Sequence, residues 1–261
     1  MSRVESDYYA FMGYDPEHTR SGLRHYLPWF STGPVLELAC GRGEFLGLLR
    51  EAGVAASGVD LDEGMVGEAR AAGHEVELAD ALTALRARPD ASVQGVFSAH
   101  FVEHLHPEAL QAVVTESARV LTPGGHLVAA TPNAGCLSVL GHDFWVDPTH
   151  VRPYDPRLLA FFCAAAGLEV VETGANPRNS GGPPPATLPP EVRIDPDLRP
   201  QVVAALQGAG GPWLEFGHLV GVLEERLRAT QAELAAVRQS YAQLLAQLYP
   251  PNEVYVVARA S

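Results

Sequence analysis

Two hydrophobic periods alternate between residue 34 and about residue 174. Short apolar runs typical of strands are separated by stretches in which apolar residues recur every three or four positions, as in amphipathic helices. This alternation predicts an α/β fold, with a parallel sheet covered by helices. The predicted strands are 35–39, 56–60, 74–79, 93–98, 126–131 and 168–174. The predicted helices are 44–52, 63–72, 107–121 and 156–166.

The pattern changes twice after this region. Prolines and glycines crowd residues 176–212, which predicts a loop or semi-rigid linker with one short helix near 201–207. Residues 213–249 then carry positions spaced alternately by three and four, the heptad seam typical of a coiled coil. The seam consists of Trp213, Phe216, Val220, Leu223, Leu227, Thr230, Leu234, Val237, Tyr241, Leu244 and Leu248, of which only Thr230 interrupts it as a polar member.

The domain organisation follows from these changes. Pro250 and Pro251 end the long helix, and residues 252–259 predict a last strand. We expect a main domain of residues 1–175 and 252–261, a linker of residues 176–212, and an association helix of residues 213–249. The helix could pack on its own domain or pair with a second copy. A seam this regular and narrow favours pairing, and therefore a homodimer.

Charge and composition exclude several classes of function. The 261 residues carry 18 basic and 31 acidic side chains, every basic one is arginine, and the net charge is −13. This charge repels phosphate backbones, which argues against a nucleic-acid partner. The three cysteines lie far apart and indicate neither disulfides nor a thiolate zinc site. Because the first residues are charged and no apolar run reaches ~18 residues, we expect a cytoplasmic protein without a transmembrane segment.

A glycine turn follows the first predicted strand, in the stretch VLELACGRGEFLGLL. Gly41 and Gly43 permit a tight turn that a ligand can approach closely. Leu46 stands where the dinucleotide fingerprint needs a third glycine, which disfavours a phosphate-cradling site. Acidic residues at three strand ends, Glu37, Asp60 and Asp80, are predicted to line one edge of the sheet. This edge suits a cationic, phosphate-free nucleoside such as S-adenosylmethionine, with Asp60 accepting from the ribose hydroxyls and Asp80 from the adenine amino group.

Four motifs follow one another in an order that is specific to one enzyme family. They are ELACGRGE (37–44), GVDLDEGMV (58–66), ADAL (79–82) and RVLTPGGHLVAATPN (119–133). Together they resemble the class I S-adenosylmethionine-dependent methyltransferases from Pro34 to Gly174, with Ala39 where many members have glycine. The resemblance implies a Rossmann-like sheet of seven strands in the order 3-2-1-4-5-7-6, whose last strand is antiparallel. The linker and the long helix are then an insertion between strands six and seven. The implied cofactor residues are Glu37, Ala39, Gly41, Gly43, Asp60, Leu61, Asp80 and Ala81, with His100 and Phe101 on the far side.

The stretch SAHFVEHLHPE follows the fourth predicted strand and concentrates ionisable side chains. His100, Glu103 and His104 share one face if this segment is helical. Methyl transfer to a hydroxyl needs a group that removes a proton, and both a histidine and a metal can serve.

Three interpretations of this stretch remain open. In the first, His100, Glu103, His104 and the distant His150 bind a divalent metal. This set is similar to the E-x-x-E-H segment of small-RNA 2′-O-methyltransferases and ubiquinone-pathway O-methyltransferases, but His100 in place of the first glutamate favours a softer metal than magnesium. In the second, His104 or His150 takes the proton without a metal, with His100 as a further catalytic candidate. In the third, Glu103 and His104 only close off the cofactor pocket or satisfy backbone groups.

Two further segments carry candidate binding residues. The loop GHDFWVDPTHVRPYDP interleaves aromatic, acidic and arginine groups, which is typical of a pocket for a hydroxyl-rich ligand such as a sugar. Its predicted substrate residues are Trp145, Asp147, Arg152 and Tyr154, although the two aromatic side chains could instead fill the core. Tyr8 and Tyr9, on a predicted N-terminal helix, either form a lid over the cofactor or pack against the protein.

The resemblance extends to the acceptor. The run from EHLHPE through DPTHVRPYDP is most similar to bacterial methyltransferases associated with surface polysaccharides and glycosylated metabolites, and the lack of an NPPY motif argues against nucleobase amines. We therefore expect O-methylation of a sugar hydroxyl. One alternative is a methyltransferase acting on the phenol, carboxyl or amine of a small metabolite. Another is an assembly module, in which the long helix spaces a complex and the fold only binds the cofactor.

Overall fold

The computed structural model describes residues 8–9, 11–179, 200–201, 204 and 213–261. The chain divides into two compact units, one of residues 1–182 with 249–261 and one of residues 183–248. Each unit is considered by itself. The short helix expected near 201–207 falls largely outside the described residues, as does most of the expected linker.

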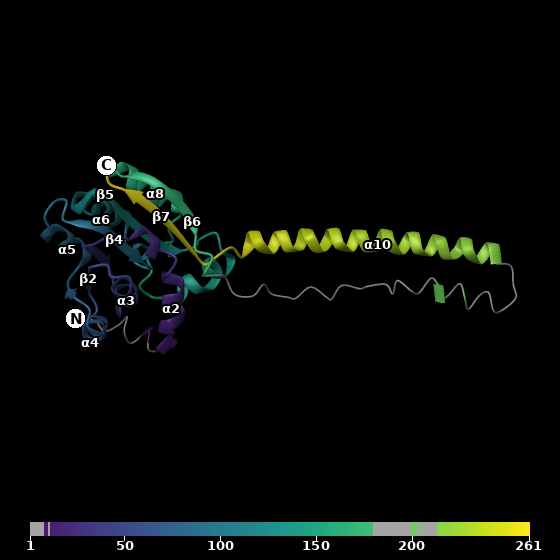
Figure 1. Ribbon diagram of the computed structural model, residues 1–261, viewed down its shortest axis with the longest axis horizontal. Helices are drawn as coiled ribbons and strands as arrows, with labels where there is room; N and C mark the ends of the chain where they lie inside the picture. The colour runs from purple at the N-terminus through teal and green to yellow at the C-terminus, as the bar shows by residue number, and fades with distance from the viewer. Residues whose placement is uncertain (1–7, 10, 180–199, 202–203, 205–212) are drawn as a thin grey trace. The chain divides into compact units, whose positions relative to one another are not determined.

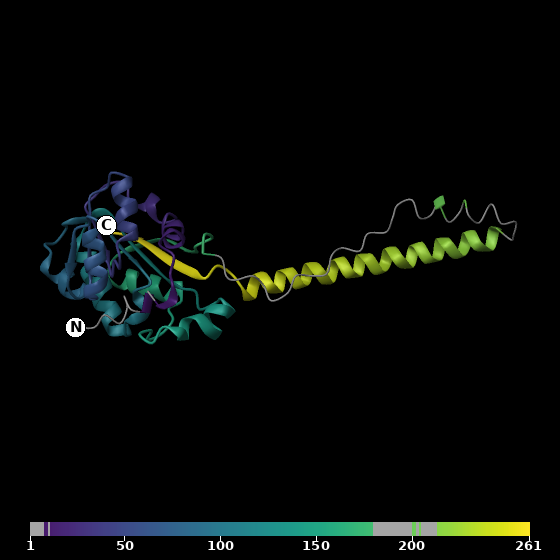
Figure 2. The same ribbon diagram turned by 90° about the horizontal axis from the view of Figure 1, so that it is seen from below.

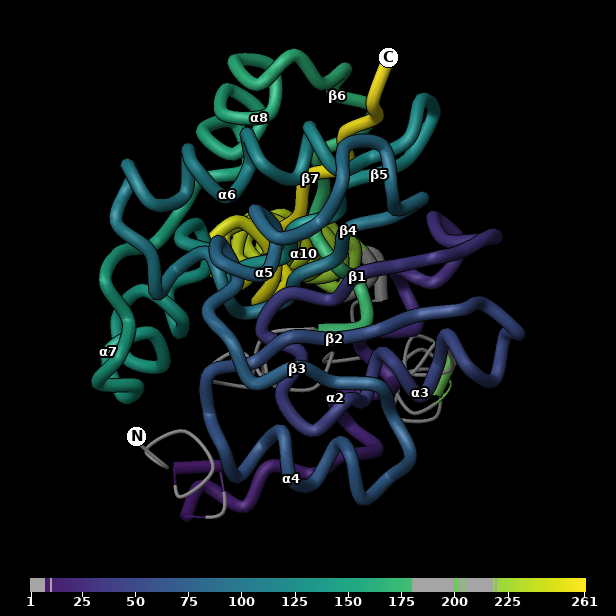
Figure 3. The backbone as a smooth tube through the Cα atoms, turned by 90° about the vertical axis from the view of Figure 1, so that its left-hand side faces the viewer, coloured from purple at the N-terminus to yellow at the C-terminus, as the bar shows by residue number. Residues whose placement is uncertain are grey.

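The first unit contains a seven-stranded sheet in the order β3-β2-β1-β4-β5-β7-β6, so the strand order implied by the family resemblance is confirmed (Figure 3). The strands are β1 (Val35–Leu38), β2 (Ala56–Asp60), β3 (Val76–Leu78), β4 (Val93–Ala99), β5 (Leu121–Pro132), β6 (Glu169–Ala175) and β7 (Glu253–Arg259). Strands β1 to β5 pair in parallel, whereas β7 is antiparallel to both β5 and β6. Parallel strands β1, β2 and β4 therefore end at the same edge of the sheet, where ligands of open α/β folds bind.

The described residues of the first unit form seven α-helices, besides two short 3-10 helices and one π-helix. They are α2 (Pro16–Leu23), α3 (Glu44–Glu51), α4 (Glu63–Ala71), α5 (Ala81–Ala87), α6 (Pro107–Val120), α7 (Phe144–Val146) and α8 (Pro156–Ala165). The 3-10 helices are η1 (Leu27–Trp29) and η2 (Val102–His104), and the π-helix is η3 (Val139–Asp143). The predicted helices correspond to α3, α4, α6 and α8. The strict alternation of strands and helices predicts a helix at the place of α5, but no residue range was predicted for it, because its seven residues fill barely two turns and its main signal is the N-cap aspartate Asp80.

The two faces of the sheet bury different side chains and different helices (Figures 1 and 2). Along β5, Leu127 and Ala129 face the core shared with α5, α6 and α8, whereas Val128 and Ala130 face α3 and the segment around η1. This period of two is the reason why the central strands read as continuous apolar runs. Each buried leucine or phenylalanine contributes roughly 1.5–3 kcal/mol to folding. With both faces covered, the strand ends are left to form a site.

The second unit contains the helix α10 (Trp213–Leu248), 36 residues long, which confirms the predicted long helix. At ~1.5 Å per residue it is about 54 Å long. Most of its described seam residues are exposed, with Leu223 57%, Leu227 43% and Val237 63% accessible, whereas Val220 and Tyr241 are half-buried. Among the described helices, none is long and apolar enough to cross a membrane.

Candidate active site

The turn between β1 and α3 takes an unusual backbone path. Ala39, Gly41 and Gly43 all have left-handed conformations, with φ of 52°, 52° and 83°. For the two glycines this path is permitted, but at Ala39 it costs roughly 1–2 kcal/mol because the Cβ approaches the following carbonyl. A side chain at Gly43 would also meet the ring of His74, at 2.7 Å. The turn therefore brings bare backbone to the carboxyl edge of the sheet, as expected for a loop that a cofactor approaches.

Asp60, at the end of β2, holds this turn in place. Its Oδ2 accepts a hydrogen bond from the Gly41 backbone N–H at 2.8 Å, and its Oδ1 accepts from Asp62 N–H at 2.8 Å. Burial raises the pKa of Asp60, although these two hydrogen bonds oppose the shift. Each carboxylate oxygen has a second lone pair, so Asp60 can still accept from ribose hydroxyls. The adjacent Leu61 is 55% exposed and is therefore accessible to a ligand.

Glu37 is the strongest sign that this edge receives a cation. Its side chain is buried, and Oε2 has no hydrogen-bond partner among the described residues. Burial raises the pKa of Glu37 well above its ordinary value, and the nearby charge of Glu44 adds to the effect. A buried carboxylate of this kind is stabilised by a positive group. The residues thus fit a cationic cofactor such as S-adenosylmethionine.

The third acidic strand end has a structural role that the sequence analysis missed. Asp80 is exposed and caps α5, with its Oδ1 accepting from the Thr83 N–H at 2.9 Å. The side chain of Ala81 is buried in the main core, and Phe101 packs partly against the same core. Ala81 can therefore face a ligand only through its backbone.

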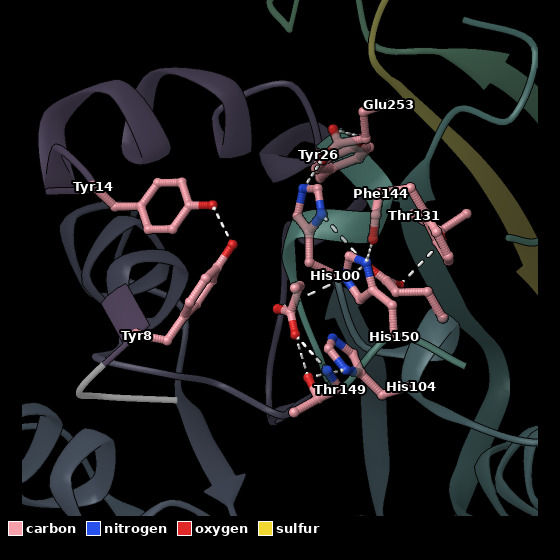
Figure 4. A network of polar contacts seen from close by, with 12 residues as sticks. Tyr8, Tyr14, Tyr26, His100, His104, Thr131, Phe144, Thr149, His150 and Glu253 are labelled. Atoms are coloured by element: carbon pink, nitrogen blue, oxygen red, sulfur yellow. Dashed lines mark hydrogen bonds and ion pairs between the residues drawn. The ribbon is translucent and has the colours of Figure 1, made fainter. Parts of the chain in front are cut away.

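His100 lies at the carboxyl end of β4 in a closed network of polar groups (Figure 4). Its Nε2 is 2.7 Å from Glu253 Oε2, and its Nδ1 is 3.5 Å from Glu103 Oε1. Glu253, the first residue of β7, also accepts from the Tyr26 hydroxyl and from Asn176 Nδ2. The network thus joins β4 and β7 to Tyr26 and to the residue that follows β6.

These contacts fix the protonation of His100. Burial alone would lower its pKa, but the hydrogen bond to Glu253 and the negative charges of Glu253 and Glu103 outweigh it and raise the pKa well above 6.5. Burial acts to raise the pKa of Glu253, yet the bonds from His100, Tyr26 and Asn176 outweigh it and lower that pKa. The raised pKa favours the imidazolium form of His100, in which both ring nitrogens carry protons. His100 is an ion-pair partner rather than a base.

The segment is not helical from His100 to His104, so these residues do not share one helical face. Only the three residues of η2 are helical, and His100 precedes them with a left-handed φ of 53°. Its ring turns to Glu253 instead. The backbone carbonyl of Glu103 accepts a hydrogen bond from Val151 N–H at 2.9 Å, and this bond docks the 141–156 loop onto η2.

This docking brings His150 to Glu103 and His104. One side-chain ligand atom from each of the three lies within 4.8 Å of the others. His150 Nε2 is 3.9 Å from Glu103 Oε1, and the rings of His104 and His150 have centroids 4.8 Å apart. Glu103 is fully buried, its Oε2 accepts from Thr131 Oγ1, and its Oε1 has no hydrogen-bond partner among the described residues. We name these three residues the 103–104–150 cluster.

Hydrogen bonds from the loop fix the tautomers of both imidazoles. His150 Nδ1 lies 2.6 Å from the Phe144 carbonyl, which can only accept, so Nδ1 carries the proton. His104 Nδ1 lies 2.9 Å from Thr149 Oγ1, and the Thr149 hydroxyl donates its own hydrogen bond to Asp147 Oδ1. The hydroxyl therefore accepts from His104 Nδ1–H. When neutral, both rings keep their lone pair on Nε2.

The other predicted substrate residues divide between surface and core. Trp145 is 62% exposed, with its Nε1 donating to the Leu140 carbonyl. Asp147 holds Thr149, as described above. Tyr154 is fully buried, its hydroxyl donates to the Leu105 carbonyl, and Arg152 stacks on its ring at 5.0 Å. The prediction that Tyr154 lines the substrate site is therefore corrected, because that side chain fills the core.

The N-terminal tyrosines lie next to the cofactor turn. Arg42 lies over the ring of Tyr9 at 5.6 Å, and the hydroxyls of Tyr8 and Tyr14 are 3.4 Å apart (Figure 4). Burial raises the pKa of Tyr8, and the contact with Tyr14 and the charge of Asp147 add to the rise. The described part of this segment therefore lies near both the turn and the 141–156 loop, where a lid would have to lie.

The fold, the left-handed turn and the acidic strand ends together are similar to those of a class I S-adenosylmethionine-dependent methyltransferase domain. Comparison with known proteins agrees, since residues 36–129 match the family described as a methyltransferase domain. A probable S-adenosylmethionine-dependent methyltransferase of Mycolicibacterium smegmatis is 35% identical over 139 residues, or 53% of each chain. The malonyl-[acyl-carrier protein] O-methyltransferase of Serratia marcescens is 35% identical over 143 residues, 52% of this chain and 54% of that protein. The chain thus spans about half the length of these curated relatives.

A solved structure extends the similarity over the whole chain. The crystal structure of a SAM dependent methyltransferase from Archaeoglobus fulgidus superposes with a TM-score of 0.69 at 25% identity. The match covers 98% of this chain and 99% of that one.

Proposed function

We propose that this protein uses S-adenosylmethionine to methylate a hydroxyl oxygen of a sugar or a glycosylated metabolite. One observation carries the proposal, namely the convergence of two imidazole lone pairs and the unpartnered Glu103 oxygen beside the cofactor edge. A methyltransferase that acts on a hydroxyl needs such a group, because a neutral alcohol is a weak nucleophile. When bound, the cofactor supplies a methyl group on a sulfonium, which a nucleophile displaces in line.

The 103–104–150 cluster then activates the acceptor. The hydroxyl proton passes to an imidazole Nε2 as the acceptor oxygen forms its bond to the methyl carbon, and the carbon–sulfur bond breaks to leave a neutral thioether. His150 Nε2 lies 3.8 Å from Asp147 Oδ2 and 3.9 Å from Glu103 Oε1, so two carboxylates stabilise the charge that the ring gains. Most of the remaining rate enhancement comes from holding the acceptor in line with the methyl group.

The charges around the cluster favour a hydroxyl over a carboxylate acceptor. Glu103, Asp147 and Glu253 contribute negative charge, against the single positive charge of His100. An anionic acceptor would be repelled by this excess. The similarity to an O-methyltransferase of Serratia marcescens supports oxygen as the acceptor atom, and the exposed Trp145 offers an apolar ring face of the kind that sugars stack on.

A panel of matched acceptors tests this proposal. Methyl glycosides, the corresponding uronic acids and the corresponding amino sugars are incubated with the full chain and radiolabelled cofactor, and transfer is quantified for each. We expect transfer to a hydroxyl of the methyl glycosides to be at least tenfold faster than transfer to the carboxylate of the uronic acids or to the amino group of the amino sugars. Faster methylation of a carboxylate or an amine would overturn the assignment.

We further infer that α10 pairs with α10 of a second copy. The seam positions Leu227, Leu234 and Val237 are 43%, 42% and 63% exposed, which is costly for a helix without a partner. In the heptad register, Glu233 and Arg238 occupy a g position and the following e position, so a parallel pair would bring them together across the interface.

Sedimentation of two double variants tests the pairing. Leu227→Lys with Leu234→Lys places charges in the seam, whereas Ala232→Lys with Gln239→Lys adds the same charge on the opposite face. We expect the first variant to sediment as a monomer and the second as a dimer. An unchanged mass for the first variant would show that the seam is not an interface between copies, and a wild-type monomer would lead to the same conclusion.

A further inference from the structure

The 103–104–150 cluster has a chemical imbalance that protons do not resolve. Glu103 offers a buried carboxylate oxygen without a hydrogen-bond partner among the described residues, and the ligand atoms of His104 and His150 lie within 4.8 Å of it. Both Nδ1 atoms already donate to loop acceptors, so the unshared electron pairs of the two rings lie on Nε2. Three electron-rich atoms therefore gather in a site with little solvent, an arrangement that a positive charge stabilises.

A proton on His150 Nε2 would attract Glu103 Oε1 but would not give it a hydrogen bond. His150 Nε2 is 3.9 Å from Glu103 Oε1 and 3.8 Å from Asp147 Oδ2, both beyond the 2.7–3.2 Å of an N–H···O hydrogen bond. His100 does not supply the missing bond either. Its nearer nitrogen is 3.5 Å from Glu103, while its other nitrogen is 2.7 Å from Glu253. None of the described residues therefore donates a hydrogen bond to Glu103 Oε1.

We propose that Glu103, His104 and His150 bind a single divalent first-row transition-metal ion of the zinc, cobalt or manganese kind. Two imidazoles and one carboxylate, with the other positions open, form a common ligand set for such ions, whereas magnesium prefers oxygen ligands. A metal at ~2.1 Å from each ligand needs ligand atoms roughly 3 Å apart, so the side chains close in by about 1 Å when the ion binds. His100 is not among the proposed ligands, because its Nε2 is turned to Glu253 at 2.7 Å.

The surroundings of the cluster match those of a metal site. A ligating histidine usually donates its other N–H to a carbonyl or carboxylate, which fixes the ring and its tautomer. Here His150 donates to the Phe144 carbonyl, and His104 donates to Thr149, which in turn donates to Asp147. Thr131 orients Glu103 in the same way, through its Oε2. Each proposed ligand therefore has one outer partner that leaves its binding atom available.

The role of the ion in catalysis rests on the proposed function, whereas its binding does not. An acceptor hydroxyl that takes an open position on the ion loses its proton to water more readily, because the metal lowers the pKa of bound oxygen. The oxygen can then displace the sulfonium as described above, without an imidazole as the proton acceptor.

Direct measurement of metal binding tests the proposal. The full chain, without a histidine tag, is stripped with a chelator and dialysed against Co²⁺ or Zn²⁺, and bound metal is quantified by elemental analysis. We expect about one ion per chain, with visible d–d absorption bands for Co²⁺. His150→Gln and Glu103→Gln should weaken the affinity at least tenfold. His142→Gln, in the same loop but 79% exposed, should leave it unchanged.

Two outcomes overturn the proposal, namely binding below about 0.1 ion per chain at saturating metal and binding that His150→Gln does not weaken. Full methyl transfer by stripped protein in the presence of chelator overturns the catalytic role of the ion and leaves the proposed function intact. Conversely, one ion per chain that depends on His150, without turnover of any acceptor, supports the metal site and counts against the proposed function. Because Glu103 is buried, Glu103→Gln could unfold the protein, so its thermal unfolding is recorded as a control. If that variant does not fold, the metal affinity of His150→Gln alone tests the proposal.

Discussion

His100 and His150 lie in neighbouring groups of side chains, yet their partners give them opposite chemistry. The ring of His100 lies between the carboxylates of Glu253 and Glu103, so both of its nitrogens keep their protons. The ring of His150 donates a hydrogen bond from Nδ1–H to the Phe144 carbonyl and keeps a lone pair on Nε2. The first group is closed, and the second is open to a ligand. A histidine at this edge can act as a base or a metal ligand when one nitrogen donates to a carbonyl or hydroxyl and the other keeps a lone pair. It is less suited to either role when both nitrogens face carboxylates.

The largest effect on activity is expected from removing the imidazole of His150, whose Nε2 carries the available lone pair. His150→Gln should lower kcat/KM by about 10²–10⁴, because the acceptor loses the group that activates its hydroxyl. This corresponds to about 3–5 kcal/mol of transition-state stabilisation. The measurement is methyl transfer from radiolabelled cofactor to a glycoside. His142→Gln, at an exposed site in the same loop, should retain full activity, and equal losses in both variants would show that the loop and not the lone pair matters.

The closed group should matter most for stability. Glu253→Gln replaces a buried carboxylate, which accepts from His100, Tyr26 and Asn176, by an amide that has one acceptor atom fewer, and we expect a loss of about 1–3 kcal/mol in the free energy of unfolding, measured with urea. The matched control is Glu169→Gln, which removes the surface partner of Arg259 on the neighbouring strand. Exposed pairs contribute ~0–1 kcal/mol, so this variant should unfold nearly as the wild type does. Similar losses in both variants would contradict the special role of Glu253.

A smaller effect on activity should follow from removing the hydrogen bond that fixes the tautomer of His104. Thr149→Val removes the hydroxyl that accepts from His104 Nδ1, so the ring is no longer restricted to one tautomer. We expect about a tenfold loss of activity. Nitrogen chemical shifts of His104 report the tautomer directly, and they should change in this variant but not in Thr115→Val, on the exposed side of α6. Unchanged shifts in Thr149→Val would show that Thr149 does not set the tautomer.

The smallest effect is a pH dependence of stability. The folded-state pKa of His100 is raised above its unfolded value of 6.5, so its ion pair stabilises the protein fully below about pH 6.5 and ceases to do so as pH rises through the folded pKa. The pKa of Glu253 is lowered, so its contribution is present above 4.5 and is lost on acidification through the folded pKa. Because His100 is 46% exposed, we expect His100→Gln to cost only about 1 kcal/mol between these limits.

Unfolding of His100→Gln and wild type across this range measures the dependence. The difference between them should shrink above neutral pH, whereas the difference between His142→Gln and wild type should stay flat. A difference that grows with rising pH would mean that His100 is neutral in the folded protein.

Much of the fold could be predicted, because each central strand is apolar on both faces and each ends before a polar turn. Gly41, Gly43 and Asp60 were placed correctly at the first two strand ends, since a left-handed turn and a following acidic residue leave a local signal. The bounds of helix α5 and the cap by Asp80 were missed, because two helical turns carry too little periodicity.

The inner arrangement of the site could not be predicted in the same way. The role of His100 depends on Glu253, which is 153 positions further along the chain and pairs with it only because β7 passes beside β5. Its only signal in the sequence is a carboxylate at the start of an otherwise apolar strand. Likewise, nothing in the interleaved pattern of the 141–156 loop distinguishes Tyr154, which turns into the core, from Trp145, which does not.

The position of β7 between β5 and β6 has a consequence for synthesis of the protein on the ribosome. β6 cannot join the sheet when it emerges, because the strand that links it to β5 is translated only after α10. Until then, the hydrogen-bonding edge of β5 remains unpaired, and such edges are prone to wrong pairing. The delay also withholds Glu253 from His100. The nascent chain should therefore depend on chaperones longer than its size suggests, and should gain activity only when β7 has been released.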